Sequence, residues 1–357
     1  MSIKFDRASK EEKYQWDSFV KTHPKGTPYH LWEYGEAFSE TYGYKRYYLV
    51  SRIKGNIVGI FPLILIRSRL FRDKLISLPF CEHGGPLINS DLKNTAVEFI
   101  AKTFLDDALS LGTNLGVDYL ELRNPSLTND YLCRDFSKQV SRYVTFKLNL
   151  LSGENQLWRF LDKKTRNSIR KSEKSNITIS EILDEAMLKK YFSLYLKIEK
   201  KYGSPPHSFS VFKSLARFET NVKYLLALHN STPVAGVIIF YSNDEIYWWN
   251  GVSDPRLRNI NATSLLLWEV IKWGCKEGYS YVSFGRTRKD TGVYHFKEAW
   301  GGKETCYIDY IYPLKDGQFS TPDPSEGKYQ LLTKLWAYLP IIVSSSLGPL
   351  IIKQIGL

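Results

Sequence analysis

The segment from Ser283 to Gly302 holds the residues whose types and spacing best suit chemistry. It reads SFGRTRKDTGVYHFKEAWGG and places Lys297 among aromatic side chains. Because an isolated ammonium group is costly to bury, a lysine in such a place either extends to water or faces an anion. A lysine that faces the negative charge developing on an acyl carbonyl would stabilise that charge. The sequence therefore predicts Lys297 as a catalytic residue of acyl transfer, with a strand lysine whose head reaches water as the alternative.

Residues near Lys297 could move a proton or hold a substrate. In acyl transfer to an amine, an enzyme positions the amine, removes a proton from it and stabilises an oxyanion. The candidate proton acceptors are Asp290, His295 and Glu298. The candidate substrate contacts in the same segment are Arg286 and Trp300.

A second candidate site is the basic segment 157–174, which reads LWRFLDKKTRNSIRKSEK. Its pattern predicts one helix with a basic face, because positions i, i+3, i+7 and i+11 lie on the same side of a helix. Arginine can bind two phosphate oxygens at once, so this face is predicted to bind phosphate. A solvated charged face is the alternative. The four residues of the predicted face are Lys163, Arg166, Arg170 and Lys174.

Aromatic residues mark a third candidate. The stretch 246–256 reads IYWWNGVSDPR, and Tyr247 and Trp249 are predicted to flank a substrate cleft. Alternation of these rings between core and surface is the other interpretation. The stretch 77–88, SLPFCEHGGPLI, is the counterpart in the first half, where consecutive glycines allow close approach to a backbone.

Several common catalytic motifs are missing from the sequence. It contains no GxSxG elbow and no GxxxxGK[ST] loop, and its six histidines show no metal-binding spacing, so no metal is expected. A coenzyme A-dependent acyltransferase normally carries a Gly/Ala-rich pyrophosphate loop at a position like the one before the helix that begins near Asn261, where helix N–H groups can bind phosphate. In this sequence the loop has Asn259 where glycine would allow close approach. This loop counts against an ordinary acyl-coenzyme A donor without excluding one.

An internal repeat organises the chain. Each half contains a β-hairpin with a polar turn, then an amphipathic helix, then an alternating strand. Gly59 aligns with Gly236, 177 residues later, and Tyr119 aligns with Tyr281, 162 residues later. The three segments lie at 47–65, 93–112 and 117–122 in the first half, and at 223–241, 261–278 and 279–284 in the second.

The order of elements predicts the fold class. Each half runs helix, helix, hairpin, strand, helix, strand, which is the order of the GNAT N-acyltransferase fold. The 357 residues are also enough for two domains. We therefore expect an α/β (α+β) protein with tandem duplicated GNAT-like acyltransferase domains, whose mixed central sheets are flanked by helices. The predicted domains are 1–150 and 151–315, followed by a linker at 316–330 and an apolar tail at 331–357.

The tail and the charge bear on partners. Residues 335–352 carry no charge, but Pro340 and Pro349 interrupt them, so a helix-turn-helix lying on the inner membrane leaflet is expected, with packing on the protein's own core as the equal alternative. The formal net charge of +12 attracts polyanions such as tRNA, lipid-linked phosphates or an anionic membrane face, or serves solubility alone. The four cysteines form no CxxC pair and the N-terminal segment is charged, which predicts a cytoplasmic protein. The protein would be membrane-associated if the tail binds lipid.

The chain resembles the FemAB family of cell-envelope aminoacyltransferases, and CelD/BcsL-type acetyltransferase domains. Three stretches carry the resemblance: the closing motif (284–287, 292–297 and 300–302), the basic entry at 164–173, and an N-terminal pattern that includes Trp16, Trp32 and Phe38. The resemblance implies two GNAT-like domains and transfer of an amino acid from aminoacyl-tRNA to the peptide stem of a peptidoglycan precursor. It also implies a catalytic role for Lys297 and contact of Arg166 or Arg170 with acceptor phosphate.

Two departures from the family leave the activity open. No helical pair is long enough for the coiled-coil arm of the best-known members, and the tail beyond 331 resembles distant members tied to exopolysaccharide loci. The expected function is an N-acyltransferase that moves an aminoacyl or acyl group to an amine on a peptidoglycan or polysaccharide precursor. Aminoacyl-tRNA or acyl-coenzyme A would be the co-substrate, with no cofactor bound permanently. The alternatives are an acyl-coenzyme A-dependent N-acetyltransferase of a small molecule and a non-catalytic module that binds tRNA or an anionic glycolipid.

Overall fold

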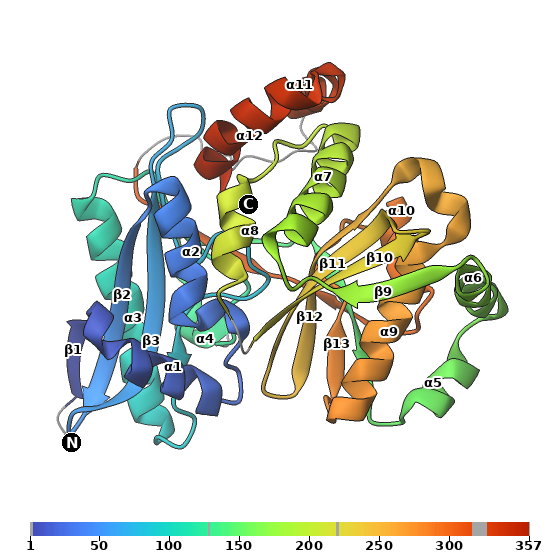
Figure 1. Cartoon of the computed structure of the whole chain (residues 1–357). Coiled ribbons are helices and arrows are strands. Elements are labelled where there is room, and N and C mark those ends of the chain that lie inside the picture. Colours follow the sequence, from blue (N-terminus) through green and yellow to red (C-terminus); the bar gives the residue numbers. More distant parts are fainter. Residues whose placement is uncertain (1–2, 128, 219–220, 316–326, 357) are drawn as a thin grey trace. The chain divides into compact units, whose positions relative to one another are not determined.

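A computed structural model describes residues 3–127, 129–218, 221–315 and 327–356 (Figure 1). The chain divides into two compact units. The first comprises the described residues of 1–142, 307–323 and 351–357, and the second comprises those of 143–306 and 324–350. Each unit has its own β-sheet and its own apolar core. The expected mixed α/β architecture with two helix-flanked sheets is confirmed.

The sheet of the first unit has the strand order β1-β2-β3-β4-β6-β15-β7, with β5 beside β3. β4 and β6 run parallel, and the other pairs are antiparallel. The strands are β1 (Ile3–Arg7), β2 (Lys45–Ile53), β3 (Asn56–Ile66), β4 (Lys74–Ile76), β5 (Leu87–Ile88), β6 (Tyr119–Leu122), β7 (Lys138–Val140) and β15 (Asp309–Pro313). The helices are η1 (Lys10–Glu12), α1 (Lys13–Thr22), η2 (Pro28–His30), α2 (Trp32–Tyr42), α3 (Asn94–Asn114) and α4 (Asn129–Leu132).

The sheet of the second unit has the strand order β14-β8-β13-β12-β11-β10-β9. Only β12 and β13 run parallel among its described pairs. The strands are β8 (Val144–Asn149), β9 (Ile177–Glu181), β10 (Val222–His229), β11 (Thr232–Ser242), β12 (Glu245–Ser253), β13 (Tyr281–Ser283) and β14 (Lys303–Cys306). The helices are α5 (Glu154–Phe160), α6 (Lys163–Glu173), α7 (Glu185–Tyr202), α8 (Phe209–Leu215), η3 (Pro255–Ile260), α9 (Ala262–Glu277), α10 (Gly292–Glu298), α11 (Gly327–Tyr338) and α12 (Ile341–Ile355).

The repeated hairpins are built alike. Both close on two residues with positive φ, Lys54-Gly55 and Asn230-Ser231, which matches the twist of paired strands. Both contain a bulge, and the residue before it, Ser51 or Ala227, faces Gly59 in one hairpin and Ala235 in the other. The structural equivalent of Gly59 is therefore Ala235, and the alignment of Gly59 with Gly236 is wrong by one residue. The turn sets the register of a hairpin, whereas the sequence alignment matched the two glycines.

Two strands join sheets that their place in the chain does not suggest. β8 pairs with β13 and β14 in the second sheet, and β15 pairs with β6 and β7 in the first. The units therefore change at residues 142/143 and 306/307, whereas the sequence placed domain limits at residues 150 and 315. Strand pairing partners are set by contacts distant in sequence, which a local pattern does not encode.

The tail forms a helix-turn-helix, α11 followed by α12. The predicted linker, 316–330, lies outside the described residues as far as 326, and its last residues belong to α11. α11 packs against α7, where a Cβ on Gly203 would lie 2.0 Å from the carbonyl oxygen of Thr333. Across the described ranges, we find no helix with both the length and the apolar character needed to cross a bilayer.

Candidate functional site

The parallel strands β12 and β13 pair over only three residues each. Glu245 lies opposite Tyr281, Tyr247 lies opposite Ser283, and β12 continues beyond this point to its end without β13. A bulge follows immediately in β12, since Ile239 faces Trp248 whereas Ile238 faces Asn250. A bulge disrupts the ladder locally and re-aims the backbone. The backbone at Trp249 is therefore a candidate to donate a hydrogen bond to an oxyanion.

Lys297 is fixed at the carboxyl end of β13. It lies on α10 and is 7% exposed. Its Nζ donates hydrogen bonds to the carbonyl oxygens of Gly285 at 2.7 Å and Arg286 at 3.1 Å. Both carbonyls follow β13 directly. A lysine side chain has three donors, so two of them are used to hold the ammonium group. The alternative of a strand lysine that reaches water is wrong, because Lys297 is helical and buried.

The other residues of the closing segment lie in different environments. Asp290 is exposed in a turn with φ of 60°, and His295 is exposed with its Nδ1 3.3 Å from Glu298. The guanidinium of Arg286 lies over the ring of Tyr143 at 5.1 Å. Trp300 is buried, and its indole nitrogen has no hydrogen-bond partner in the described part of the chain. It lines a 570 Å³ hollow with residues that include Leu157 and Trp268.

The basic segment 157–174 forms two helices, so the prediction of one helix is wrong. Leu161 has an extended backbone with ψ of 142°, which separates α5 from α6. Asp162 then caps α6, since its carboxylate accepts a hydrogen bond from the backbone N–H of Thr165. Aspartate favours the N-cap position because its side chain replaces a missing backbone acceptor.

The two predicted arginines of this segment contact α5. The Nη1 of Arg166 donates to the carbonyl oxygens of Leu161 at 2.7 Å and Arg159 at 3.1 Å, at the C-terminal end of α5. The guanidinium of Arg170 lies 5.4 Å from the centre of the Trp158 ring. Cations stabilise helix C-termini because the last carbonyls lack intrahelical partners. Arg166 thus has a structural role that differs from the predicted phosphate contact.

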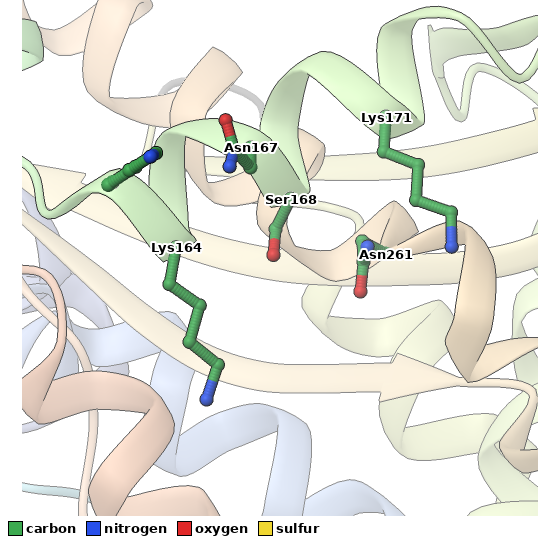
Figure 2. Close-up of a pocket in the computed structure, with 6 residues that line it drawn as sticks. Lys164, Asn167, Ser168, Lys171 and Asn261 are labelled. Carbon is green, nitrogen blue, oxygen red and sulfur yellow. The ribbon is translucent and has the colours of Figure 1, made fainter.

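A neighbouring face of α6 lines a pocket of about 430 Å³ (Figure 2). Lys164, Ser168 and Lys171 extend from α6 toward the side on which Asn261 lies, just before α9. Asn261 has φ of 55°, a left-handed conformation that starts α9. The first N–H groups of a helix lack backbone acceptors and carry partial positive charge. The complete lining is Lys163, Lys164, Asn167, Ser168, Lys171 and Asn261.

This pocket has the character of an anion site. Its lining includes three lysines and no carboxylate, and an N-terminus such as that of α9 favours phosphate. Of the predicted basic face, only Lys163 lines it. The buried residues Thr165, Ile169 and Ser172 mark the side of α6 that packs on the protein. Their spacing in the sequence was the signal that could have identified the lysines of the pocket, which lie beside this buried side.

The predicted aromatic contacts form a packed cluster. Tyr247 is buried, and the ring of Trp249 lies 5.5 Å from that of Phe240 and 6.5 Å from that of His207. Burial lowers the pKa of His207 to about 3, so its imidazole is neutral at physiological pH. Among the described residues, no group of histidines, cysteines and carboxylates could hold a metal ion.

The segment 161–298 matches the family model described as an acetyltransferase (GNAT) domain. This segment begins two residues before the basic helix α6 and ends one residue after Lys297. It therefore includes the α6–α9 pocket, the bulge in β12 and Lys297. The second unit therefore carries a GNAT domain, and the prediction of a GNAT-type acyltransferase is confirmed. A comparison with curated proteins found no match.

Solved structures share the fold over nearly the whole chain. FemX has a TM-score of 0.69 at 14% identity, covering 94% of this chain and 100% of FemX. A tandem GNAT protein from the clavulanic acid biosynthesis pathway has a TM-score of 0.53 at 11% identity, covering 89% and 100%. L-PGS from Bacillus licheniformis has a TM-score of 0.53 at 11% identity, covering 94% and 96%. These likenesses confirm the FemAB-like, tandem GNAT fold.

Proposed function

We propose that the protein transfers an aminoacyl or acyl group from a phosphate-bearing donor to an amine on a cell-envelope precursor. The observation that carries this proposal is the lysine-lined pocket between α6 and the N-terminus of α9 in a GNAT domain. Three lysines of α6 and Asn261, the residue that precedes the 16-residue helix α9, line one 430 Å³ space. A donor that carries phosphate or pyrophosphate fits that chemistry.

The reaction forms one bond and breaks another. The acceptor amine attacks the acyl carbonyl carbon, a C–N bond forms, and the C–S bond of a thioester or the C–O bond of an aminoacyl ester breaks. A base takes the amine proton, and the leaving sulfur or oxygen takes a proton. His295 and Asp290 stay proposals for the base. The backbone at the β12 bulge and the ammonium of Lys297 are the proposed stabilisers of the oxyanion.

Lys297 also supports the site by positioning it. Its hydrogen bonds fix the backbone of Gly285 and Arg286 where β13 ends, beside the point where β12 loses its parallel partner. Arg286 and Trp249 are retained as proposed substrate contacts because Trp249 follows this point within β12 and Arg286 lies just after the end of β13. Loss of positioning should appear as a loss of stability, and loss of an oxyanion contact should add a large decrease in the transfer rate of the molecules that remain folded.

Two donors share the required phosphate chemistry, acyl-coenzyme A and aminoacyl-tRNA. The loop before α9 folds as η3 and ends at Asn261, with Asp254 holding the guanidinium of Arg256 at 2.8 Å. A glycine-rich turn would let backbone N–H groups approach a pyrophosphate closely. At this site the pocket is lined instead by lysines of α6. Lysine binds phosphate as a point charge without a fixed geometry, which suits a tRNA backbone as well as coenzyme A.

Likeness to solved structures and the net charge of the chain support the proposed acceptor class. One solved structure with this fold is FemX. Another is the C-terminal domain of a putative lysylphosphatidylglycerol synthetase from Agrobacterium fabrum, with a TM-score of 0.54 at 8% identity, covering 84% of this chain and 91% of that domain. Together with the net charge of +12, the likeness to these proteins favours an anionic envelope precursor, approached from the cytoplasmic side, over a small free amine.

A transfer assay with both donors tests the proposal. The full chain would be incubated with radiolabelled acetyl-coenzyme A or aminoacyl-tRNA, together with extracted nucleotide-linked and lipid-linked envelope precursors. Labelled precursor from one donor supports the proposal and identifies the donor. Label transferred only to small free amines would favour the small-molecule N-acetyltransferase. Salt-dependent tRNA binding without product from any donor would favour the non-catalytic module.

A further inference from the structure

Over residues 341–350, helix α12 buries two small residues and exposes its aliphatic ones. Ser344 and Gly348, four positions apart, are its buried residues. A Cβ on Gly348 would lie 2.3 Å from the Cδ of Pro206, so the helix packs there as closely as glycine allows. The large side chains lie elsewhere on the helix and are exposed: Ile341, Ile342, Val343, Leu347 and Leu350.

Helical geometry gathers the exposed side chains into one stripe. Successive residues of an α-helix are rotated by about 100°. Positions 342, 343, 346, 347 and 350 therefore fall within a sector of about 140°, and positions 344 and 348 lie on the opposite side. Ile341, in the first turn, is exposed outside this stripe. A surface helix normally turns its apolar stripe to the core and its polar residues to water. In α12 this arrangement is reversed.

Helix α11, which precedes α12 in the tail, also exposes apolar side chains. Its Leu335 and Tyr338 are 58% and 86% exposed. Together with α12, drawn in red in Figure 1, they account for seven of the large apolar side chains that are exposed in the described chain. Clustered exposed apolar residues mark an interaction site, whereas single ones need no explanation. We call these seven residues the tail patch: Leu335, Tyr338, Ile341, Ile342, Val343, Leu347 and Leu350.

The charges around the tail patch select its partner. From Gly327 to the last residue the sequence contains no aspartate or glutamate, and its charged residues there are Lys328, Lys334 and Lys353. Lysine flanking an apolar surface, with no carboxylate to repel phosphate, matches an interfacial helix on an anionic bilayer. We propose that the tail patch inserts into the interface of a membrane that contains anionic lipid. The proposal goes beyond acyl transfer and does not depend on it.

Vesicle sedimentation with the full chain tests this proposal. The probes are vesicles of phosphatidylcholine alone and of phosphatidylcholine with phosphatidylglycerol. The test variant is Ile342→Glu combined with Leu347→Glu, and both positions are exposed, so folding is retained. The matched control is Leu183→Glu, at a leucine that is 84% exposed outside the tail. Thermal unfolding of each variant confirms that it folds.

The wild type and Leu183→Glu are expected to bind the anionic vesicles. The double variant is expected to bind them at least about tenfold more weakly, because each of its substitutions removes an aliphatic side chain that would be buried in the lipid. Equal binding by the double variant would overturn the proposal, as would wild-type binding that ignores the anionic lipid. A lipid-free dimer that the double variant dissociates would overturn it too, and would identify a second copy as the occupant.

Discussion

The ammonium group of Lys297 donates a 2.7 Å hydrogen bond to the carbonyl oxygen of Gly285. This bond links α10 to the end of β13 within the GNAT domain. A second bond, to Arg286, makes the contact bidentate. The residue that the sequence selected for catalysis is therefore also part of the framework, which changes what its substitution should do.

We expect Lys297→Met to reduce both stability and transfer. Removing the ammonium leaves two carbonyls without this donor, which should lower the free energy of unfolding by about 1–3 kcal/mol. If the ammonium also contacts the oxyanion, transfer per folded molecule should fall a further 100-fold or so. Denaturant unfolding and single-turnover transfer measure the two effects separately. Lys276→Met, the same substitution at an exposed position of α9, is the control, and unchanged single-turnover transfer in Lys297→Met would limit Lys297 to positioning.

Arg166→Met should act on stability. The guanidinium caps the C-terminal carbonyls of α5, so its loss should cost about 1–2 kcal/mol of unfolding free energy. Arg159→Met removes the same charge from an exposed position of α5 and should cost little. Donor affinity should be similar in the two variants. A selective loss of donor affinity in Arg166→Met, at unchanged stability, would contradict the capping role.

Asn261 should respond differently to glycine and to alanine. Its φ of 55° is left-handed, a conformation that alanine adopts at a cost of about 1 kcal/mol and glycine adopts freely. Asn261→Gly should therefore be at least as stable as the wild type, and Asn261→Ala should be less stable than both. Thermal unfolding checks this order. If backbone N–H groups of α9 bind the donor, Asn261→Gly should retain affinity, and a large loss would assign binding to the asparagine amide instead.

Glu199 should make stability depend on pH. Burial raises the pKa of this α7 carboxyl to about 8, so between about pH 4.5 and 8 the folded protein binds a proton that the unfolded chain has released. Stability then falls as pH rises through this window. Glu199→Gln does not titrate, so its melting temperature relative to the wild type should increase from pH 5 to pH 9. A difference that stays constant across this range would contradict the raised pKa.

The sequence was most informative where a pattern is local. Hairpins with two-residue turns, and helices such as α3 and α9, follow from periodicity and turn residues. The sheet memberships of β8 and β15 depend on distant partners and were not predicted. The helix break at Asp162 was missed because its basic neighbours fit one continuous helical face, although aspartate before a helix is a capping signal.

The tail packs on the protein through one face of α12, as one of the two sequence alternatives expected, whereas its contact with a membrane stays a proposal. Its packing on the protein was one expectation and an interfacial helix-turn-helix was the other. Ser344 and Gly348 provide the packing face, while Ile342 and Leu350 lie on the exposed one. Composition revealed an apolar segment, but only the position of each side chain around the helix separates the two faces.

Calorimetric titration of donors into two lysine variants tests the central claim most directly. Lys171 lines the α6–α9 pocket and Lys174, three residues later, does not; both are exposed, so Lys171→Ala and Lys174→Ala remove equal charge from the same helix end. Acetyl-coenzyme A and aminoacyl-tRNA would be titrated at about 0.15 M salt, where long-range attraction is screened. We predict that one donor binds the wild type and Lys174→Ala alike, and binds Lys171→Ala about tenfold more weakly. Equal affinity of both variants for every donor that binds would contradict the claim that this pocket holds the donor phosphates.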